Sequence, residues 1–593
     1  MTTGQSLRFT LIGAIFTLVG LLIFGRMVSL QSGPQKEAFI HHWEITSGRP
    51  VQLIPARGKI YDRWGHLLAG NETVYEIGVD LWEKDLNPET IALAGSVVLG
   101  IDYNIILSDL KLKISDRHAY YVLDKYGTSD EVNHLKILMD ELREDPSSNG
   151  TSTDGKPHTL IGLNFDPYFQ RIYPEKNLAS NVLGFVNKEP ISVYGVEGYF
   201  DDLLSGVTKE YWYPFDPNRV TELPDSTEGA SLILTLDREI QASVEEILDN
   251  AVESNGAYAG TIIVMQPKTG DILAMATSPR MNINEYWRVG EVFDDDQVFN
   301  LAIHSYEPGS VFKVFTMASA LDSGTVTPET TYLDTGIYQI GGIPIYNWNR
   351  GAWGPQTMLG CMQHSLNVCL AWVSDQMGAQ IFYSYLQDFG FGLPTGIELD
   401  SEVSGHLKLP GDSDWYEADL GTNAFGQGIS VTPVQMLMGL SAIANDGKMV
   451  VPRIVHSVVD RDRQYNTSIQ IAGQPISKET ANTLTEMLAF SLEEEASTAL
   501  VPGYRVAGKT GTAEIPSPQG YISSVTNASF TGWGPVDDPQ FIVYIWIEKP
   551  TSSPWGSVVA APIFGEVVQR LVVLLNLPPD PVRQSLALPE GTP

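Results

Sequence analysis

An uncharged apolar stretch lies near the amino terminus, bracketed by Arg8 and Arg26. Its residues 9–25 are at the lower limit of the roughly 17–25 that a membrane-spanning helix needs, and the flanking arginines could extend it by reaching to the interfaces. A cleaved signal peptide and a buried soluble helix are the alternatives. Residues 25–29 contain no small-x-small cleavage site, so the pattern favours an uncleaved anchor over residues 9–26, after a short cytoplasmic tail of residues 1–8.

The next 200 residues mix short extended segments with helical ones. A short strand between turns at Gly58 and Gly65 is predicted within residues 57–69. Residues 86–145 are rich in Leu, Lys and Asp and predict helices, and extended pieces with Gly and Pro continue to about residue 228. The pattern predicts an α+β stalk domain over residues 27–229.

A larger mixed domain is predicted over residues 230–576. It begins with a strand that leads into a helix capped by Asp237. A tight hairpin over residues 260–275, a buried strand at 541–547 and an apolar helix at 564–575 follow. Residues 577–593 are rich in proline and predict a flexible tail. The fold class is therefore mixed α/β, with a single N-terminal transmembrane helix and two extramembrane domains.

Composition narrows the classes of function. The chain has 593 residues, too many for one average domain, and 43% of them are hydrophobic, which excludes wholesale disorder. With 37 basic against 71 acidic residues, the formal charge is -34. This charge repels phosphate backbones and argues against nucleic acid as a partner.

The chain has two cysteines, Cys361 and Cys369, too few for a disulfide scaffold or a Cys-rich zinc site. Both lie in the segment 359–377, whose apolar residues recur at helical spacing. Eight residues of helix rise about 12 Å, whereas bridged Cα atoms are seldom more than about 7 Å apart. Both cysteines are therefore expected to be free and buried.

Three short motifs stand out in the larger domain: Ser310-Val311-Phe312-Lys313, Ser365-Leu366-Asn367 and Lys509-Thr510-Gly511-Thr512. Each type of motif occurs a second time, and these second copies are at Ser108–Lys111, Ser147–Asn149 and Lys268–Gly270. The second copies are interpreted as a surface helix, a polar loop and a hairpin turn. Context therefore decides which set carries chemistry.

Ser310 leads into an uncharged helix over residues 314–321. A hydroxyl at a helix amino terminus lies where the backbone favours developing negative charge. Lys313 lies one turn further on the same face, where partial burial would lower its pKa and let a neutral amine accept the serine proton. The alternative is a helix-capping serine beside a solvated lysine.

The other two motifs have equally plain alternatives. Ser365 and Asn367 lie near the start of the predicted helix and could serve only as capping or hydrogen-bonding residues. Lys509 precedes Gly511 on a predicted strand, where glycine would let an extended ligand approach the backbone. Its alternative is a strand lysine that faces solvent.

The ordered trio is the signature of the penicilloyl-serine transferases. Residues 57–69 and 195–206 resemble the stalk domain of class B penicillin-binding proteins, and residues 389–397 and 425–435 add to the resemblance to this class. Over residues 8–575 the chain resembles a class B penicillin-binding protein, with no stretch long enough for a glycosyltransferase domain. The resemblance implies a transpeptidase domain with a central antiparallel sheet flanked by helices, behind a dimerisation-type pedestal.

The resemblance also implies the reaction. A membrane-anchored D,D-transpeptidase would cross-link peptidoglycan stem peptides through an acyl-enzyme on Ser310, and β-lactams would acylate the same serine. Lys313 would be the general base, Ser365 would relay the proton and Lys509 would tune it. The donor peptide would be held by four residues: Asn367, Thr510, Gly511 and Thr512. The backbone N–H groups of Ser310 and Thr512 would form the oxyanion hole. Neither a metal nor a cofactor is implied.

The substrate lies outside the cell membrane, so the resemblance implies a single-pass protein with an extracytoplasmic catalytic domain in a bacterium. The charges that flank residues 9–25 do not settle this orientation by themselves. A polytopic membrane glycosyltransferase and other cell-wall synthesis proteins are the expected partners. A D,D-carboxypeptidase, a membrane-bound β-lactam sensor and a β-lactamase are the alternatives. The sensor is disfavoured because only a short segment precedes the anchor.

Overall fold

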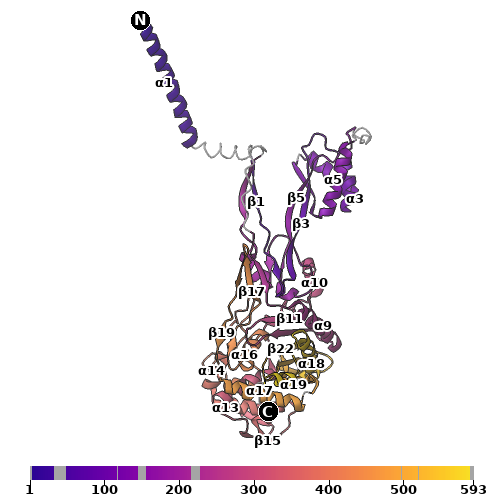
Figure 1. The fold of residues 1–593 in the computed structure, drawn as a ribbon, viewed down its shortest axis with the longest axis vertical. Helices are drawn as coiled ribbons and strands as arrows, with labels where there is room; N and C mark the ends of the chain where they lie inside the picture. Colours follow the sequence, from indigo (N-terminus) through magenta and orange to yellow (C-terminus); the bar gives the residue numbers. More distant parts are fainter. Residues whose placement is uncertain are drawn as a thin grey trace. The chain divides into compact units, whose positions relative to one another are not determined.

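The computed structural model describes residues 3–32, 48–116, 118–144, 155–214, 228–495, 497–517 and 520–587. It divides into two units. The first contains Met1–Ala56 and Gly206–Glu228, and the second contains Arg57–Ser205 and Gly229–Pro593. The first unit contains helix α1 (Thr3–Ser32) and an antiparallel pair of strands, β1 (Gly48–Leu53) and β8 (Lys209–Pro214) (Figure 1).

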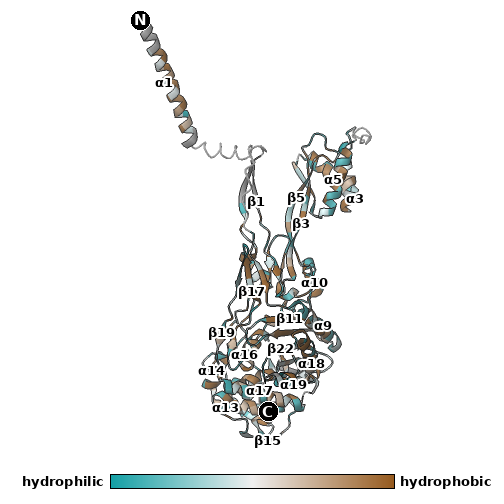
Figure 2. Cartoon of the chain, in the orientation of Figure 1, coloured by the Kyte–Doolittle hydropathy of each residue, from teal (hydrophilic) through white to brown (hydrophobic). Residues whose placement is uncertain are grey.

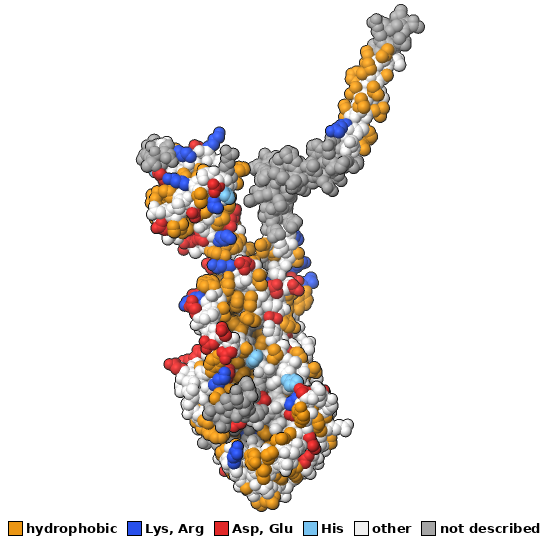
Figure 3. Space-filling model, turned by 180° about the vertical axis from the view of Figure 1, so that it is seen from behind, with side chains coloured by type: hydrophobic (Ala, Val, Ile, Leu, Met, Phe, Trp, Pro, Cys, Tyr) orange, Lys and Arg blue, Asp and Glu red, His pale blue; other side chains and the backbone are white. Residues whose placement is uncertain are grey.

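Helix α1 contains the predicted anchor. Its segment Thr10–Ser29 is long and apolar enough to cross a membrane (Figure 2), and its side chains are exposed (Figure 3). A second helix of similar length and composition, α18 (Gly556–Leu574), is 56% buried inside the second unit. The partners of α18 within the fold identify it as a core helix.

The stalk part of the second unit is built on the long strand β3 (Leu67–Asp80). It pairs with β2 (Ile60–Tyr61), β4 (Tyr120–Gly127) and β5 (Leu163–Ile172). Helices α3 (Pro88–Leu99), α4 (Tyr103–Ser115) and α5 (Ser129–Glu144) enclose a separate small core with β3. Strand β4 interrupts the region predicted as helical, because its run of Tyr and Val residues favours extended structure.

One sheet continues from the stalk into the larger domain. Its order is β18-β17-β9-β2-β3-β4, where β18 is Arg463–Asn466. Strand β9 (Ser231–Leu234) is parallel to β2 and antiparallel to β17 (Val455–Asp460). Nearby, the buried carboxylate of Glu197 pairs with Arg57 at 2.7 Å and with Arg171 at 2.6 Å. The β2–β9 pairing joins the base of the stalk to the larger domain, and the buried ion pairs hold the segments of that base together.

The larger domain is organised around a five-stranded antiparallel sheet. The strand order is β11 (Ile272–Ser278), β10 (Ala259–Met265), β22 (Phe541–Glu548), β21 (Gly520–Gly534) and β20 (Ala507–Ser517). Successive residues of β22 enter two different cores, as expected for a strand covered on both faces. The predicted hairpin and the predicted buried strand are both confirmed.

Helices cover both faces of this sheet. One face carries α9 (Arg238–Asn255) and α18, which pack on each other and on the sheet. The other core includes residues of α11 (Lys313–Asp322), α13 (Asn367–Met377), α16 (Pro433–Ala444) and α17 (Lys478–Glu495). Asp237 caps α9 by accepting hydrogen bonds from Glu239 N and Ile240 N, as its sequence context predicts. The predicted mixed α/β fold is confirmed.

Two boundaries near the carboxyl terminus differ from expectation. Helix α18 begins at Gly556, before the predicted residue 564, and includes Pro562. The predicted flexible tail contains helix α19 (Asp580–Ala587). Asp580 N donates to Gly503 O, and Arg505 N donates to Asp580 Oδ2. The long-range hydrogen bonds that hold α19 leave no periodic pattern in the sequence.

The remaining elements are short. In chain order, those before residue 313 are α6 (Ser180–Leu183), β6 (Phe185–Val186), β7 (Ser192–Val193), α7 (Gly195–Tyr199), α8 (Asp201–Leu204), η2 (Ile283–Arg288), α10 (Val289–Val292), η3 (Leu301–Ile303) and η4 (Gly309–Phe312). Those after it are β12 (Thr331–Asp334), β13 (Ile337–Ile340), β14 (Ile343–Tyr346), β15 (Gly354–Thr357), α12 (Met358–Gln363), α14 (Ala379–Asp388), α15 (Glu417–Asn423), β16 (Met449–Val450), β18 (Arg463–Asn466), β19 (Ile471–Gly473) and η5 (Ser497–Ala499).

Candidate active site

Ser310 lies in the short 3₁₀ helix η4, which runs directly into α11. The turn packs against β20, and Gly309 makes this approach possible. Gly309 has φ +61, and a Cβ there would lie 2.7 Å from Thr512 O. Because only glycine tolerates both the backbone conformation and the contact, the sequence at residue 309 sets the position of the serine that follows.

Lys313 begins α11 and is completely buried. Its Nζ lies 2.6 Å from Ser365 O, 3.1 Å from Ser365 Oγ and 2.7 Å from Asn367 Oδ1. Burial holds the pKa of Lys313 well below its usual value, and the nearby charge of Lys509 lowers it further. A lowered pKa favours the neutral amine, which is the form of Lys313 that can accept a proton.

Ser365 lies in a turn between two helices, which corrects the prediction of one continuous helix over residues 359–377. Helix α12 ends at Gln363 and α13 begins at Asn367. Ser365 between them has φ +53, in the left-handed region that non-glycine residues rarely adopt. A strained residue that carries a hydroxyl towards two lysines marks a functional site.

The prediction of free cysteines is wrong for the same reason. Cys361 on α12 and Cys369 on α13 form a disulfide with a Cα–Cα distance of 6.1 Å. The turn at Ser365 makes the distance between the two Cα atoms shorter than it would be in a continuous helix, so they come within bridging range. The disulfide joins the two helices that present Ser365 and Asn367.

The third motif lies on β20, at the end of the strand order of the central sheet. Lys509 is 4% exposed, and its Nζ lies 3.0 Å from Ser365 Oγ and 3.1 Å from Thr510 O. A Cβ at Gly511 would lie 2.2 Å from Ser529 Oγ and 2.8 Å from Val311 Cγ1. The strand can approach the Ser310 turn because residue 511 has no side chain.

The three motifs therefore meet at one place. Ser365 Oγ is within hydrogen-bonding distance of both Lys313 Nζ and Lys509 Nζ. These groups surround a cavity of about 670 Å³, whose lining includes the predicted residues Ser310, Ser365, Asn367, Lys509, Thr510, Gly511 and Thr512. The chain brings together every predicted site residue, with Lys313 buried behind the cavity wall.

The cavity has walls that the sequence did not reveal. Tyr346, Trp348 and Arg350 come from the segment around β14, and Trp555 precedes α18. The rings of Trp348 and Trp555 meet edge to face with centroids 5.5 Å apart, and Arg350 Cζ lies 5.3 Å from the Tyr346 ring centroid. Only the unusual density of aromatic residues at 346–353 could have suggested this wall.

Two of the second copies of the motifs lie in the described part of the chain, and both are outside this cavity. Ser108 and Lys111 are exposed on α4, and Lys268 is in the β10–β11 turn, where it pairs with Asp538. Ser147–Asn149 lies outside the described residues. In the described part of the chain, no group of three or more His, Cys, Asp or Glu side chains could hold a metal ion.

Two family models match the chain. The penicillin binding protein transpeptidase domain matches residues 260–569, and the penicillin-binding protein dimerisation domain matches residues 52–212. Stage V sporulation protein D of Bacillus subtilis is 30% identical over 98% of this chain and 87% of its own length. Peptidoglycan D,D-transpeptidase FtsI of Escherichia coli is 28% identical over 97% of this chain and 93% of its own length.

Solved structures have the same fold. Penicillin binding protein 2X from Streptococcus thermophilus superposes with a TM-score of 0.73 at 24% identity, covering 89% of this chain and 80% of that one. Penicillin binding protein 3 from Mycobacterium tuberculosis, complexed with aztreonam, superposes with a TM-score of 0.67 at 24% identity. The match covers 90% of this chain and 98% of that one. The fold and the two family matches together define an enzyme of the transpeptidase class. The chain belongs to the penicillin-binding protein family that combines a dimerisation domain with a transpeptidase domain.

Proposed function

We propose that this enzyme cross-links peptidoglycan stem peptides by D,D-transpeptidation, with Ser310 as the nucleophile. The observation that carries the proposal is the contact of Ser365 Oγ with both Lys313 Nζ and Lys509 Nζ beside Ser310. Lys313 is buried and its pKa is lowered, so its neutral amine takes the proton of Ser310. Ser310 Oγ then attacks the carbonyl between the two terminal D-alanines of the donor.

Ser365 completes the proton transfer to the departing D-alanine. Its hydroxyl lies between the two lysines, so it can pass a proton from Lys313 to the leaving amine while Lys509 stabilises the negative charge that develops. A second stem peptide then supplies an amine that takes the acyl group from Ser310. The same relay, run in reverse, removes the proton from that amine.

The donor is positioned by β20 and α13. Lys509, Thr510, Gly511 and Thr512 line the cavity and would hold the terminal carboxylate of the donor, a cationic pocket in an acidic protein. Asn367 would hydrogen-bond the donor's peptide amide. The backbone N–H groups of Ser310 and Thr512 would bind the oxyanion of the tetrahedral intermediate. A β-lactam that mimics this donor would acylate Ser310.

The site of action follows from the substrate. Peptidoglycan lies outside the cell membrane, so α1 would anchor the chain with its catalytic domain on the extracytoplasmic side of a bacterial membrane. Residues 27–229 would form the pedestal and residues 230–576 the transpeptidase domain. A polytopic membrane glycosyltransferase that supplies new glycan strands is the expected partner, along with other cell-wall synthesis proteins.

The test is covalent labelling of the detergent-solubilised full chain by fluorescent penicillin. Wild-type protein should take one label on Ser310, and Ser310→Ala should take none. The thermal transition should hardly change, since the Ser310 hydroxyl caps neither η4 nor α11. Ser108→Ala is the matched control and should label normally. Undiminished labelling of Ser310→Ala would remove the serine from the mechanism.

A further inference from the structure

A second cavity, of about 370 Å³, begins beside the Ser310 turn. Tyr306 and Glu307, which lead into that turn, form part of its lining, as do Glu514 and Ile515 at the far end of the catalytic motif on β20. Glu514 lines both this cavity and the catalytic one. The two cavities therefore meet at the strand that carries Thr512.

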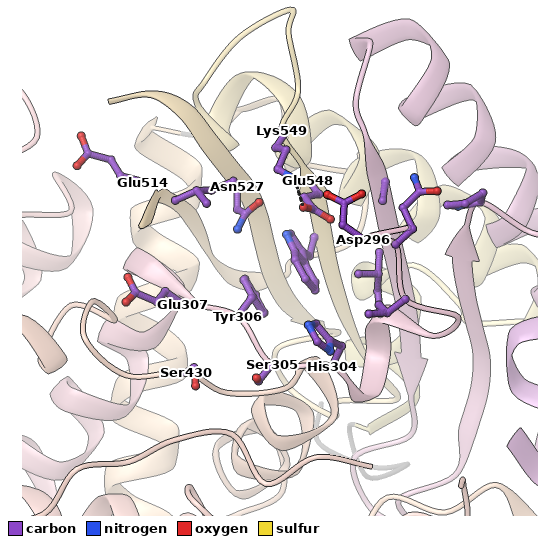
Figure 4. Close-up of a pocket in the computed structure, with 17 residues that line it drawn as sticks. Asp296, His304, Ser305, Tyr306, Glu307, Ser430, Glu514, Asn527, Glu548 and Lys549 are labelled. Atoms are coloured by element: carbon purple, nitrogen blue, oxygen red, sulfur yellow. Dashed lines mark ion pairs between the residues drawn. The ribbon is translucent and has the colours of Figure 1, made fainter. Parts of the chain in front are cut away.

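The charge of the second cavity is opposite to that of the donor pocket. Its lining contains four carboxylates, from Asp296, Glu307, Glu514 and Glu548, against one lysine (Figure 4). That lysine, Lys549, pairs with Glu548 at 3.0 Å and lies over the Tyr258 ring. A negatively charged cavity next to a positively charged one can distinguish two peptides, because each cavity attracts the peptide group of opposite charge.

The lining also contains a pair of aromatic rings. Tyr306 and Trp546 stack with their ring centroids 3.9 Å apart. Aromatic faces attract ammonium groups, more strongly where water is partly excluded. Carboxylates and aromatic rings in one lining are a combination suited to an organic cation.

Two buried polar atoms in the same lining have no hydrogen-bond partner among the described residues. They are the Asn527 side-chain oxygen, on a residue only 7% exposed, and the Trp546 indole N–H. Figure 4 shows the Asn527 amide directed into the space between Tyr306 and Glu548. Buried polar groups are normally satisfied, so an unpaired acceptor directed into a cavity points to a ligand that supplies a donor.

We propose that this acidic cavity, lined by Asp296, Glu548, Asn527, Tyr306 and Trp546 among others, binds the amine-bearing side chain of the acceptor stem peptide. The inference rests on the transpeptidase function proposed above and locates its second substrate. An ammonium group donates to the carboxylates and to Asn527 Oδ1. A metal ion fits less well, because the carboxylates are spread along the lining rather than gathered.

The bound acceptor reaches the acyl-enzyme past Glu514. The ammonium loses one proton to solvent, and the neutral nitrogen attacks the ester carbonyl carbon. The new C–N bond forms as the C–O bond to Ser310 breaks. The nitrogen gives up its second proton to the Ser365 and Lys313 relay, which returns a proton to Ser310 Oγ, so free enzyme and one amide result.

The test measures how the acyl-enzyme divides between water and amines. The detergent-solubilised full chain is given a thioester donor ending in an acyl-D-alanyl group. Increasing amounts of a lysine-containing stem peptide, or of hydroxylamine, are added at mildly alkaline pH. The lysine amine is cationic there, whereas hydroxylamine is uncharged. Mass spectrometry gives the ratio of amide to hydrolysis product at each acceptor concentration.

The double variant Asp296→Asn, Glu548→Gln should need at least about tenfold more lysine peptide for half-saturation, the size of a lost charge-assisted hydrogen bond. Its capture by hydroxylamine should match wild type. Asn527→Asp should shift the half-saturation for the lysine peptide in the opposite direction. The control Asp295→Asn removes an exposed carboxylate next to Asp296 but outside the cavity lining, and should match wild type throughout.

Penicillin acylation of Ser310 serves as the check on folding and separates two kinds of failure. If the double variant is acylated normally and saturates like wild type, the acceptor site is overturned and the transpeptidase function stands. An equal loss with hydroxylamine would also overturn it, because the effect would not depend on charge. If the double variant is not acylated, the result for Asn527→Asp decides between the two. A lower half-saturating concentration of lysine peptide supports the site, and an unchanged or higher one overturns it. A wild-type chain that forms no amide would overturn the proposed function itself.

Discussion

Two Ser-x-x-Lys segments of this chain share a spacing and little else. Ser310 and Lys313 lie where a 3₁₀ turn enters α11, and Ser108 and Lys111 lie on the exposed surface of α4. Lys313 is fully buried, whereas the side chain of Lys111 is 53% exposed and lies 4.0 Å from Glu89. The hydroxyl of Ser108 donates to Ile105 O within its own helix. The environment of each motif, rather than its spacing, therefore determines whether its serine and lysine can react.

The surroundings act through the charge of the lysine. The hydrogen-bond partners of Lys313 Nζ in the described structure are uncharged oxygens, from Ser365 and Asn367. Uncharged partners satisfy a buried amine without stabilising its proton as a carboxylate would, so desolvation prevails and the pKa falls. Lys111, in contrast, is exposed to solvent and lies near the carboxylate of Glu89. Burial and the nature of the partner, rather than sequence spacing, distinguish Lys313, the proposed base, from the surface lysine Lys111.

The largest effect is expected from replacing Lys313, the proposed general base. Lys313→Arg retains the positive charge, but an arginine side chain holds its proton at any working pH. Acylation by penicillin should fall by at least the roughly 10²-fold typical of lost general base catalysis. Lys111→Arg should leave the rate unchanged. Stopped-flow labelling measures both rates, and retention of most of the rate in Lys313→Arg would show that another group is the base.

The pH dependence of acylation should follow the protonation of the same amine. Because the pKa of Lys313 is lowered, the amine is neutral above that pKa and protonated below it. Acylation should therefore be constant at higher pH and fall about tenfold per pH unit below the pKa, as the neutral amine is lost. Measuring the second-order rate constant across pH would test this, and a flat profile through the acidic range would contradict it.

The sequence predicted those parts of the fold that depend on local patterns. The buried strand β22 and the Asp237 cap of α9 follow from a run of apolar residues and from one carboxylate before a helix. The contact of Lys509 with Ser365 could be inferred only through the family resemblance, because it depends on the packing of β20 against η4 and the α12–α13 turn. The turn itself was missed because apolar residues on both sides keep helical spacing across it, while the backbone at Ser365 does not.

The disulfide provides an effect on stability rather than on chemistry. Replacing both Cys361 and Cys369 with alanine should lower the free energy of unfolding by about 2–3 kcal/mol, as expected for a short loop. It should lower acylation less than Lys313→Arg does, since the turn would lose a brace but keep its hydroxyl. Thermal unfolding with and without reductant measures the effect. Identical transitions for the oxidised wild type and the variant would show that packing alone holds α12 to α13.

The smallest effect is expected on the surface helix that carries Ser108 and Lys111. Asp102 caps α4 by accepting hydrogen bonds from Asn104 N and Ile105 N. Asp102→Ala should destabilise the fold by about 1 kcal/mol, because the cap satisfies backbone donors that the helix itself cannot. The control Asp116→Ala, at the opposite end of α4, should cost less, since a carboxylate there faces the negative end of the helix dipole. Thermal unfolding gives both values. Penicillin acylation should not change in either variant, and a loss of labelling in Asp102→Ala would mean that this helix communicates with Ser310 after all.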